Sequence, residues 1–219
     1  MTRPLVLASA AAIFFRDVIW FSSGRHHTIE SMNAQEAPGP GPVIFTIGHS
    51  TRSAAEFLDL LRENGIGRLA DIRRFPASRR LPHFNSGPLA AELASAGIAY
   101  RHFEDLGGRR PARPGSPHTG WRVEAFRGYA DYMESAEFAV ALADLERWAR
   151  EGPTAVMCAE ALHFKCHRRL TSDALRRDGF DVRHVTGPRR VEPHQYTPFV
   201  RVEETSRRLV YDVGELPLE

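Results

Sequence analysis

The chain is poor in the features that mark several large classes of protein. It has two cysteines, Cys158 and Cys166, which are too few for a disulfide framework. Its N-terminal apolar run, Leu5 to Phe15, is interrupted by Arg16 and is too short for a transmembrane helix. The formal net charge of +2 is too small to indicate wrapping of nucleic acid. These absences favour a cytoplasmic protein with reduced thiols and no membrane partner.

Lysine is also scarce, because Lys165 is the only one and the other basic residues are arginine or histidine. Between Arg68 and Arg122 the arginines outnumber the acidic residues, so association with nucleic acid is open but weakly indicated. Because arginine can replace lysine through codon bias alone, the positions of the arginines carry more information than their number.

Composition and length fit a globular protein with one core. The apolar fraction is 42% and the charged fraction 26%, both ordinary values. Residues 1–42 read as an N-terminal extension ending in a Pro- and Gly-rich linker. Three interpretations apply to it: an unstructured tail or a true start at Met32, a signal peptide, or a packed element. Residues 43–186 read as the globular domain, and residues 187–219 as a C-terminal extension, either a hairpin or a loose tail.

Short apolar runs alternate with helical patterns along the globular domain. A capping box from Ser53 to Glu56 predicts the start of the first helix. The junctions at Gly65 and Gly97 each join a helix to a strand, which favours right-handed parallel crossovers. The expected strands are Val43–Ile47, Arg68–Ile72, Ile98–His102, Thr154–Met157 and Phe180–Thr186. The expected helices run from Ser53 to Gly65, Pro88 to Ala96, Trp121 to Met133, Ser135 to Arg150 and Leu170 to Arg177, and the long stretch from Glu104 to Gly120 reads as a lid or a disordered loop.

Several motifs resemble those of the family known as domain of unknown function 488, over roughly Val43 to Val185. The resemblance implies a Rossmann-like α/β domain found in bacteria and archaea, and it implies no established reaction. With the strand pattern, it predicts a three-layer sandwich with a mostly parallel sheet of about five strands. The motifs are Thr46-Ile-Gly-His-Ser50, Asp71-Ile-Arg-Arg-Phe-Pro76 with Ser78, Gly97-Ile98 with Tyr100, Leu106-Gly-Gly108, Phe126, Tyr132-Met133, Cys158-Ala-Glu160 and Cys166-His-Arg168.

The segment from Cys158 to Arg169 concentrates the groups that carry chemistry, directly after a strand. In a parallel α/β sheet the loops at the carboxyl ends of the strands form the ligand crevice, so residues of several loops should meet there. We expect a pocket for a small anionic or nucleotide-like ligand. The alternative is that Asp71 and the arginines form ion pairs that fix the loops. The expected ligand-binding residues are Ser50, Asp71, Arg73, Arg79, Arg109, Cys166, His167 and Arg168.

Three residues are candidates for catalysis. Glu160 is the first, because a carboxylate half buried at a strand end can act as an acid or base. His49 is the second, on a turn where an imidazole could transfer a proton. Cys158 is a candidate nucleophile if nearby arginines lower its pKa, although cysteine at a strand end is often an inert packing residue.

A metal site is the main rival. Glu160, His163 and His167 would share one face of a helix if the helix began that early, and a cysteine could add a soft ligand. The Cys-x7-Cys spacing does not match a zinc ribbon, so no metal ligands are assigned. The sequence identifies no cofactor and no oligomeric state.

Three classes of function therefore remain. The first is a small hydrolase or transferase acting on a phosphate-bearing or nucleotide-like ligand, for which acid, imidazole and guanidinium groups converge. The second is a non-catalytic binding or nucleic-acid-associated module. The third is a metal- or thiol-dependent redox protein.

Overall fold

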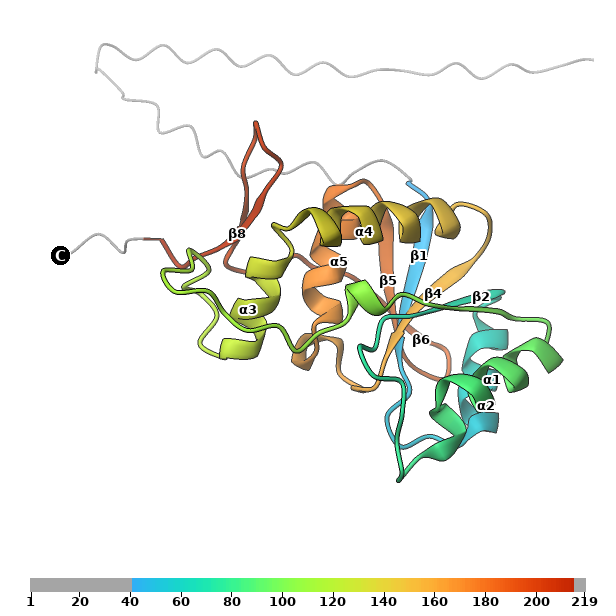
Figure 1. Cartoon of the computed structure of the whole chain (residues 1–219). Helices are drawn as coiled ribbons and strands as arrows, with labels where there is room; N and C mark the ends of the chain where they lie inside the picture. The colour runs from blue at the N-terminus through green and yellow to red at the C-terminus, as the bar shows by residue number, and fades with distance from the viewer. Residues whose placement is uncertain (1–40, 215–219) are drawn as a thin grey trace, which may run out of the picture. The chain divides into compact units, whose positions relative to one another are not determined.

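A computed structural model describes residues 41–214 of the chain (Figure 1). The expected extension over residues 1–42 therefore lies almost wholly outside the described residues. The described part contains five α-helices and eight strands; helices separate the strands as far as β5, and the last four strands follow one another. No helix between residues 41 and 214 is long and apolar enough to cross a membrane.

The main sheet has six strands in the order β3-β2-β4-β1-β5-β6. The first five are parallel, and β6 is antiparallel to β5. The prediction of a mostly parallel α/β sheet is confirmed, and the expected five strands become six. The strands are β1 (Val43–Gly48), β2 (Arg68–Asp71), β3 (Ala99–His102), β4 (Thr154–Cys158), β5 (Asp181–Gly187) and β6 (Arg190–Pro193).

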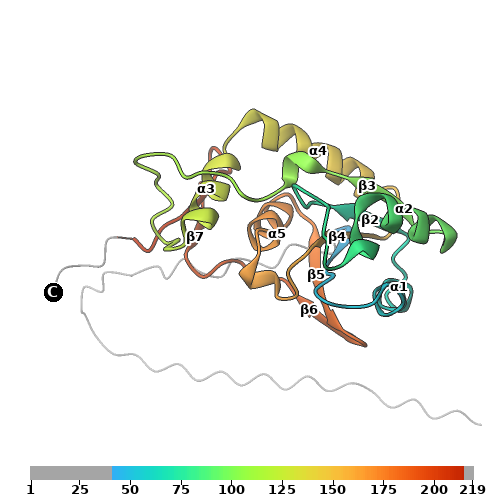
Figure 2. The same ribbon diagram turned by 60° about the horizontal axis from the view of Figure 1, so that its bottom comes forward.

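Two helices cover one face of the sheet, and two others cover the opposite face (Figure 2). Successive residues of a strand point to opposite faces, so Ala155 packs with α1 and α2 while Val156 packs with α4 and α5. The helices are α1 (Ala54–Glu63), α2 (Ser86–Ser95), α3 (Glu124–Tyr132), α4 (Ala136–Ala149) and α5 (Arg168–Arg177). Three short 3-10 turns join them: η1 (Pro82–Phe84), η2 (Glu104–Leu106) and η3 (His163–Lys165).

The capping box predicted from the sequence starts α1 as expected. The Ser53 hydroxyl accepts a hydrogen bond from the Glu56 amide, and the Glu56 carboxylate accepts one from the Ser53 amide at 2.7 Å. The buried face of α1 then presents Phe57, Leu58 and Leu61 to the sheet. This helix supports the loop that follows β1.

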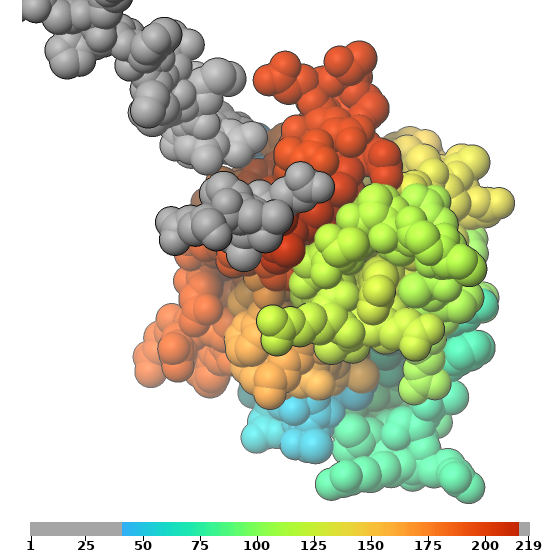
Figure 3. Space-filling model, turned by 90° about the vertical axis from the view of Figure 1, so that its left-hand side faces the viewer, coloured from blue at the N-terminus to red at the C-terminus, as the bar shows by residue number. Residues whose placement is uncertain are grey.

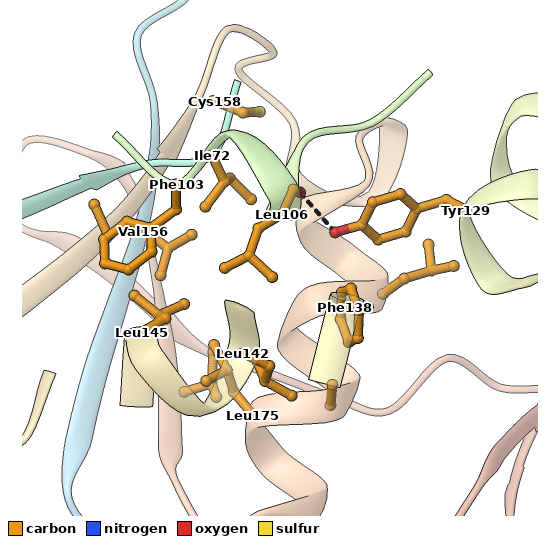
Figure 4. Packing of buried hydrophobic residues seen from close by; sticks show 14 of the residues in the cluster. Ile72, Phe103, Leu106, Tyr129, Phe138, Leu142, Leu145, Val156, Cys158 and Leu175 are labelled. Carbon is orange, nitrogen blue, oxygen red and sulfur yellow. Dashed lines mark hydrogen bonds between the residues drawn. The ribbon is translucent and has the colours of Figure 1, made fainter. Parts of the chain in front are cut away.

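The larger core lies between the sheet and helices α3, α4 and α5 (Figure 4). Phe138, Leu142 and Leu145 of α4 pack there beside Val156, and Cys158 lies at one edge of the same cluster. The Tyr129 hydroxyl donates a hydrogen bond to the Leu106 carbonyl at 2.8 Å, which ties α3 to the loop after β3. The stretch expected to be a lid or a disordered loop is thus attached to the core at its start.

The residues after β6 form an antiparallel hairpin of β7 (Val200–Val202) and β8 (Leu209–Tyr211). Its aromatic side chains pack on the segment before α3, with ring centroids of Trp121 and Phe199 4.9 Å apart. Figure 3 shows the two segments side by side, in red and yellow-green. The hairpin therefore extends the core on the α3 side.

The register of the three central strands brings their carboxyl ends to one level. Gly48 lies opposite Cys158, and Asp71 lies opposite Met157. Beyond the sheet, the His49 amide donates to the Cys158 carbonyl at 3.0 Å. A side chain at position 48 has no space, because an added Cβ would lie 1.9 Å from the Glu160 carbonyl oxygen. The loops after β1 and β4 are thus in backbone contact.

We therefore expect Gly48→Ala to lower the free energy of unfolding by about 1–3 kcal/mol, because backbone atoms must move to admit the methyl group. Gly87→Ala is the matched control, since no atom lies within 4 Å of the Cβ that would be added there. Urea titration of the three proteins measures the effect. Equal stability of Gly48→Ala and Gly87→Ala would contradict the close packing of the two loops.

Candidate functional site

A cavity of about 620 Å³ opens at the carboxyl ends of β2 and β4. Its lining combines cationic, aromatic and thiol side chains from four separate segments. The segments are the loop after β2, the loop after η2, the start of α3 and the turn after β4. The lining residues are Arg73, Arg74, Phe75, Ala77, Gly108, Arg109, Val123, Ala125, Phe126, Cys158, Ala159, Glu160, Lys165, Cys166 and His167.

The cavity has a strongly positive lining. Arg73, Arg74, Arg109 and Lys165 contribute four cations, and Glu160 is the only carboxylate among the lining residues. A concave site with this balance favours anionic ligands. Arg109, one of the expected ligand-binding residues, lines the cavity, and Arg74 and Lys165 are additions that sequence reasoning missed. Lys165 could have been found, because the chain's single lysine stands inside the thiol-bearing motif.

Both thiols line the cavity, and both are almost fully buried. Cys158 ends β4, and Cys166 lies two residues before α5. Burial raises the pKa of the Cys158 thiol well above its usual range, and interaction with Cys166 raises it further. The condition under which Cys158 would be a nucleophile is therefore not met, because burial outweighs the charge of Arg168.

Cys166 is the more acidic thiol of the two. Burial alone would raise its pKa, but interaction with Cys158 and the charge of Arg168 outweigh burial and lower the pKa to about 7. The Arg168 backbone amide, at the start of α5, also points at Cys166 Sγ, 3.5 Å away. Cys166, placed among the ligand-binding residues by sequence, is thus the better nucleophile.

His167 lies beside that thiol in a defined tautomer. Its Nε2 is 3.0 Å from the Ile72 carbonyl oxygen, which can only accept a hydrogen bond, so Nε2 carries the proton. The other nitrogen, Nδ1, is then bare and lies 3.5 Å from Cys166 Sγ. Burial lowers the pKa of His167, so the ring is neutral and able to accept the thiol proton. Gly108 gives this ring its space, because an added Cβ would lie 3.0 Å from Nδ1.

Arg168 lies behind the thiols rather than in the cavity. Its side chain is 1% exposed. Its Nε donates to Cys158 Sγ at 3.1 Å, and one terminal nitrogen donates to the Glu160 carbonyl at 2.6 Å. The other terminal nitrogen donates to the hydroxyl of Thr46 at 3.4 Å. The structure thus places Arg168 as the support of the thiol-bearing turn, away from the surface where a ligand would bind.

Asp71 and Arg73 form a buried ion pair, which is the alternative that the sequence left open for Asp71. The Arg73 guanidinium donates to both carboxylate oxygens, with the shortest contact at 2.6 Å. The Tyr100 hydroxyl donates to the same carboxylate at 2.8 Å. Both carboxylate oxygens of Asp71 are therefore occupied by contacts that hold the loop, whereas Arg73 also lines the cavity.

His49 does not reach the cavity. It is buried and stacks on Phe84, with ring centroids 4.1 Å apart. Its Nδ1 donates to the Ser50 carbonyl at 2.8 Å, and Arg73 lies near its Nε2. Burial lowers the pKa of His49 to about 4 despite the bond to Ser50. The environment expected for a proton-transfer group at this position is absent, and Ser50 likewise lies outside the cavity lining.

Glu160 and Arg79 are both exposed. Glu160 stands on the cavity rim, where its carboxylate accepts only a long contact from the Leu162 amide at 3.4 Å. The partial burial that its role as acid or base relied on is therefore missing. Arg79 lies in the loop between β2 and η1 and does not line the cavity. The ends of these loops meet as expected, but not every side chain turns inward.

The metal-site alternative depends on a helix that does not form. Helix α5 begins at Arg168, so Glu160, His163 and His167 do not share a helical face. His163 instead stacks on His184, with ring centroids 3.6 Å apart. Between residues 41 and 214, no group of three or more His, Cys, Asp or Glu side chains is arranged to hold a metal ion.

The long loop after η2 contributes one arginine to the cavity. Arg109 lines it, whereas the Arg110 guanidinium lies over the Tyr132 ring at 3.6 Å and Arg113 pairs with Asp131 and Glu134. The loop is thus fastened to α3 instead of standing open as a free lid.

Comparison with known proteins decides the family. The profile described as "Domain of unknown function DUF488" matches residues 53–175. The chain belongs to this family. The match covers β2, β3, β4 and most of α5, and it therefore includes every lining residue of the cavity in this DUF488 domain. No curated protein and no solved structure matches the chain.

The unequal acidity of the two thiols gives a direct test. We expect iodoacetamide to modify Cys166 first, with a rate that rises with pH through a midpoint near 7, because only the thiolate reacts. Cys158 should react slowly throughout. Mass spectrometry of the two cysteine peptides after timed labelling separates them. Faster labelling of Cys158, or a midpoint at the value of a free thiol, would contradict the assignment.

Proposed function

We propose that this DUF488 domain is a small hydrolase or transferase acting on a phosphate-bearing or nucleotide-like ligand, with Cys166 as its nucleophile. The observation that carries the proposal is the position of an acidic thiol on the wall of a cavity that four cations line. The proposal includes a Rossmann-like three-layer fold, whose ligands bind at the carboxyl ends of the strands. A cytoplasmic setting would keep both thiols reduced.

The cationic side chains support an anionic ligand. Phosphate oxygens accept hydrogen bonds from guanidinium groups at two points at once, and Arg74 and Arg109 have no carboxylate partner among the described residues. Arg73 remains paired with Asp71, so its N–H groups are largely occupied and its main contribution to the cavity is positive charge. Lys165 adds a point charge to the cavity lining.

Aromatic side chains at the same cavity support a planar group on the ligand. Phe75 is 61% exposed, which is unusual for phenylalanine and leaves its ring available for stacking. Phe126 adds a second, half-buried ring to the lining. A cavity of about 620 Å³ has room for a nucleoside phosphate. These features favour a nucleotide-like ligand over inorganic phosphate.

The chemistry proposed for the site is nucleophilic substitution in two steps. His167 Nδ1 accepts the thiol proton, and Cys166 Sγ attacks an electrophilic phosphorus or carbon atom of the ligand. The leaving group departs with the bonding electron pair and takes the proton from His167. Water in a hydrolase, or an acceptor hydroxyl or amine in a transferase, then attacks the intermediate, gives its proton to His167 and displaces the enzyme thiolate. Glu160 on the rim is placed to orient that second nucleophile.

One observation favours a second candidate, a thiol redox protein. Cys158 and Cys166 line the same cavity and influence each other's acidity. A dithiol mechanism requires both cysteines, whereas the substitution mechanism requires Cys166 alone. A non-catalytic binding module would require neither.

Binding is tested with ADP and with pyrophosphate as probes. We expect Arg74→Ala and Arg109→Ala each to weaken binding about tenfold, because a charge-assisted hydrogen bond contributes roughly 1.5–3 kcal/mol. Arg79→Ala is the matched control, an exposed arginine outside the lining, and should bind as the parent does. Isothermal titration calorimetry at low and high salt gives the constants. An equal loss for Arg79→Ala would show that binding follows general surface charge.

Turnover is tested with phosphate esters and nucleotides that bind in that titration. We expect Cys166→Ser to bind as the parent does and to lose turnover, because a hydroxyl of high pKa replaces the thiolate. Cys158→Ser should retain turnover at a reduced rate. Loss of activity in both variants, with oxidation of the parent to a disulfide, would favour the redox candidate instead. Full activity of Cys166→Ser would remove the nucleophile from the proposal.

A further inference from the structure

Helix α5 carries two buried charged side chains. Arg168 is 1% exposed and Asp173 is 0% exposed. Among residues 41–214, no carboxylate lies within ion-pair distance of Arg168, and no lysine or arginine lies within that distance of Asp173. A buried charge without compensation is costly, so the structure must supply compensation in another form.

A chain of buried hydrogen bonds joins these two charges. Asp173 Oδ1 lies 2.9 Å from His194 Nε2. His194 Nδ1 lies 2.9 Å from His184 Nε2, and His184 Nδ1 lies 2.7 Å from the Thr46 hydroxyl. The guanidinium of Arg168 then donates to the same hydroxyl at 3.4 Å. The three linking side chains are each at most 2% exposed.

With one proton on each imidazole, the donors and acceptors fix a single direction for this hydrogen-bond chain. An ionised carboxylate only accepts, so the single ring proton of His194 lies on Nε2, and Nδ1 accepts. His184 must then donate from Nε2 and accept at Nδ1, which leaves the Thr46 hydroxyl to donate to His184. The hydroxyl oxygen is free to accept from Arg168. Each member then donates toward Asp173.

Independent features of the structure agree with this direction. Burial and the charges of its neighbours lower the pKa of His184 to about 2, so this ring is neutral. Three further donors, the amide and hydroxyl of Thr197 and the hydroxyl of Tyr211, lie 2.7–3.1 Å from Asp173, as suits a group that only accepts. His163 stacks on His184 and covers the chain on that side.

We propose that Asp173, His194, His184 and Thr46 are positioning residues that hold Arg168 against Cys158 and so stabilise the thiolate of the thiol pair. The proposal rests on the proposed function, because the thiolate is the nucleophile there. Each hydrogen bond polarises the next. The negative charge of Asp173 therefore stabilises the Arg168 guanidinium through the hydrogen-bond chain, without direct contact between the two groups. Arg168 thereby keeps one fixed orientation, with Nε toward Cys158 Sγ at 3.1 Å.

The thiols face few other groups that could set their ionisation. These are His167 at the start of α5, Tyr129 on α3, Arg73 and Arg74 after β2, and Glu160 and Lys165 of their own segment. None of these side chains takes part in the buried chain. Removal of the Thr46 hydroxyl therefore interrupts the hydrogen-bond chain that supports Arg168 and leaves the cavity wall intact.

The test is the pH profile of Cys166 alkylation in the full chain, with mass spectrometry as the readout. Thr46→Val keeps the shape of the side chain and removes the link, so we expect the profile to move up by about one pH unit, a tenfold slower reaction at low pH. Thr46→Ser restores a hydroxyl and should restore the profile. Thr154→Val is the matched control, a buried threonine at the far end of β4 that bonds only to Gly152.

An unchanged profile in a folded Thr46→Val protein would overturn the proposal, as would an equal shift in Thr154→Val. If Thr46→Val does not fold, nitrogen-15 NMR of the parent decides. A bare Nδ1 on His184, with a shift of its signal after alkylation of Cys166, supports the proposal. A protonated Nδ1 overturns it. ADP titration of the same variants tests the proposed function separately. Their affinity for ADP should be unchanged, because Thr46, His184, His194 and Asp173 do not line the ligand cavity.

Discussion

The guanidinium of Arg168 is the interaction on which the rest of the site depends. It is buried at the start of α5 and holds Thr46 on β1, the Cys158 thiol at the end of β4 and the carbonyl of Glu160 in the following turn. One side chain thus fixes the relative positions of two strands, a turn and a helix. Because a buried cation requires negative charge nearby, the same contacts also favour a thiolate.

The parallel register supplies the frame in which that side chain can act. Gly48 and Cys158 lie opposite each other, and the missing side chain at position 48 lets the turn after β4 pass directly over β1. The loop after β2 comes from the neighbouring strand, and the Asp71–Arg73 pair holds it in place. The cavity is therefore a product of strand order, and its walls come from segments that are far apart in the sequence.

Much of the fold could be predicted from the sequence, because it depends on local patterns. The capping box at Ser53 and the five apolar runs identify α1 and the parallel strands. Strand β6 escaped prediction because all four of its residues are exposed, so it shows no alternation of buried and exposed positions. As an edge strand it depends on pairing with β5 instead of on its own apolar residues.

The site was harder to predict, because its chemistry depends on contacts between distant residues. The sequence located the thiol-bearing turn, but it could not show that Arg168 points inward or that Glu160 points outward. The tautomer of His167 depends on the Ile72 carbonyl, which lies 95 positions away in the chain. The link between Thr46 and His184 spans 138 positions. Such contacts have no signature in local spacing, so residue type alone could not show that Arg79 and Arg168 lie outside the cavity lining or that the two cysteines differ in acidity.

Lys165 gives the domain a practical property. Because it is the chain's only lysine and lines the cavity, its ε-amine is the one primary side-chain amine on the whole polypeptide. An activated ester attached to a fluorophore would therefore label one side chain, at the mouth of the cavity, besides the N-terminal α-amine. The emission of that dye would then report the arrival of any occupant, without an engineered residue.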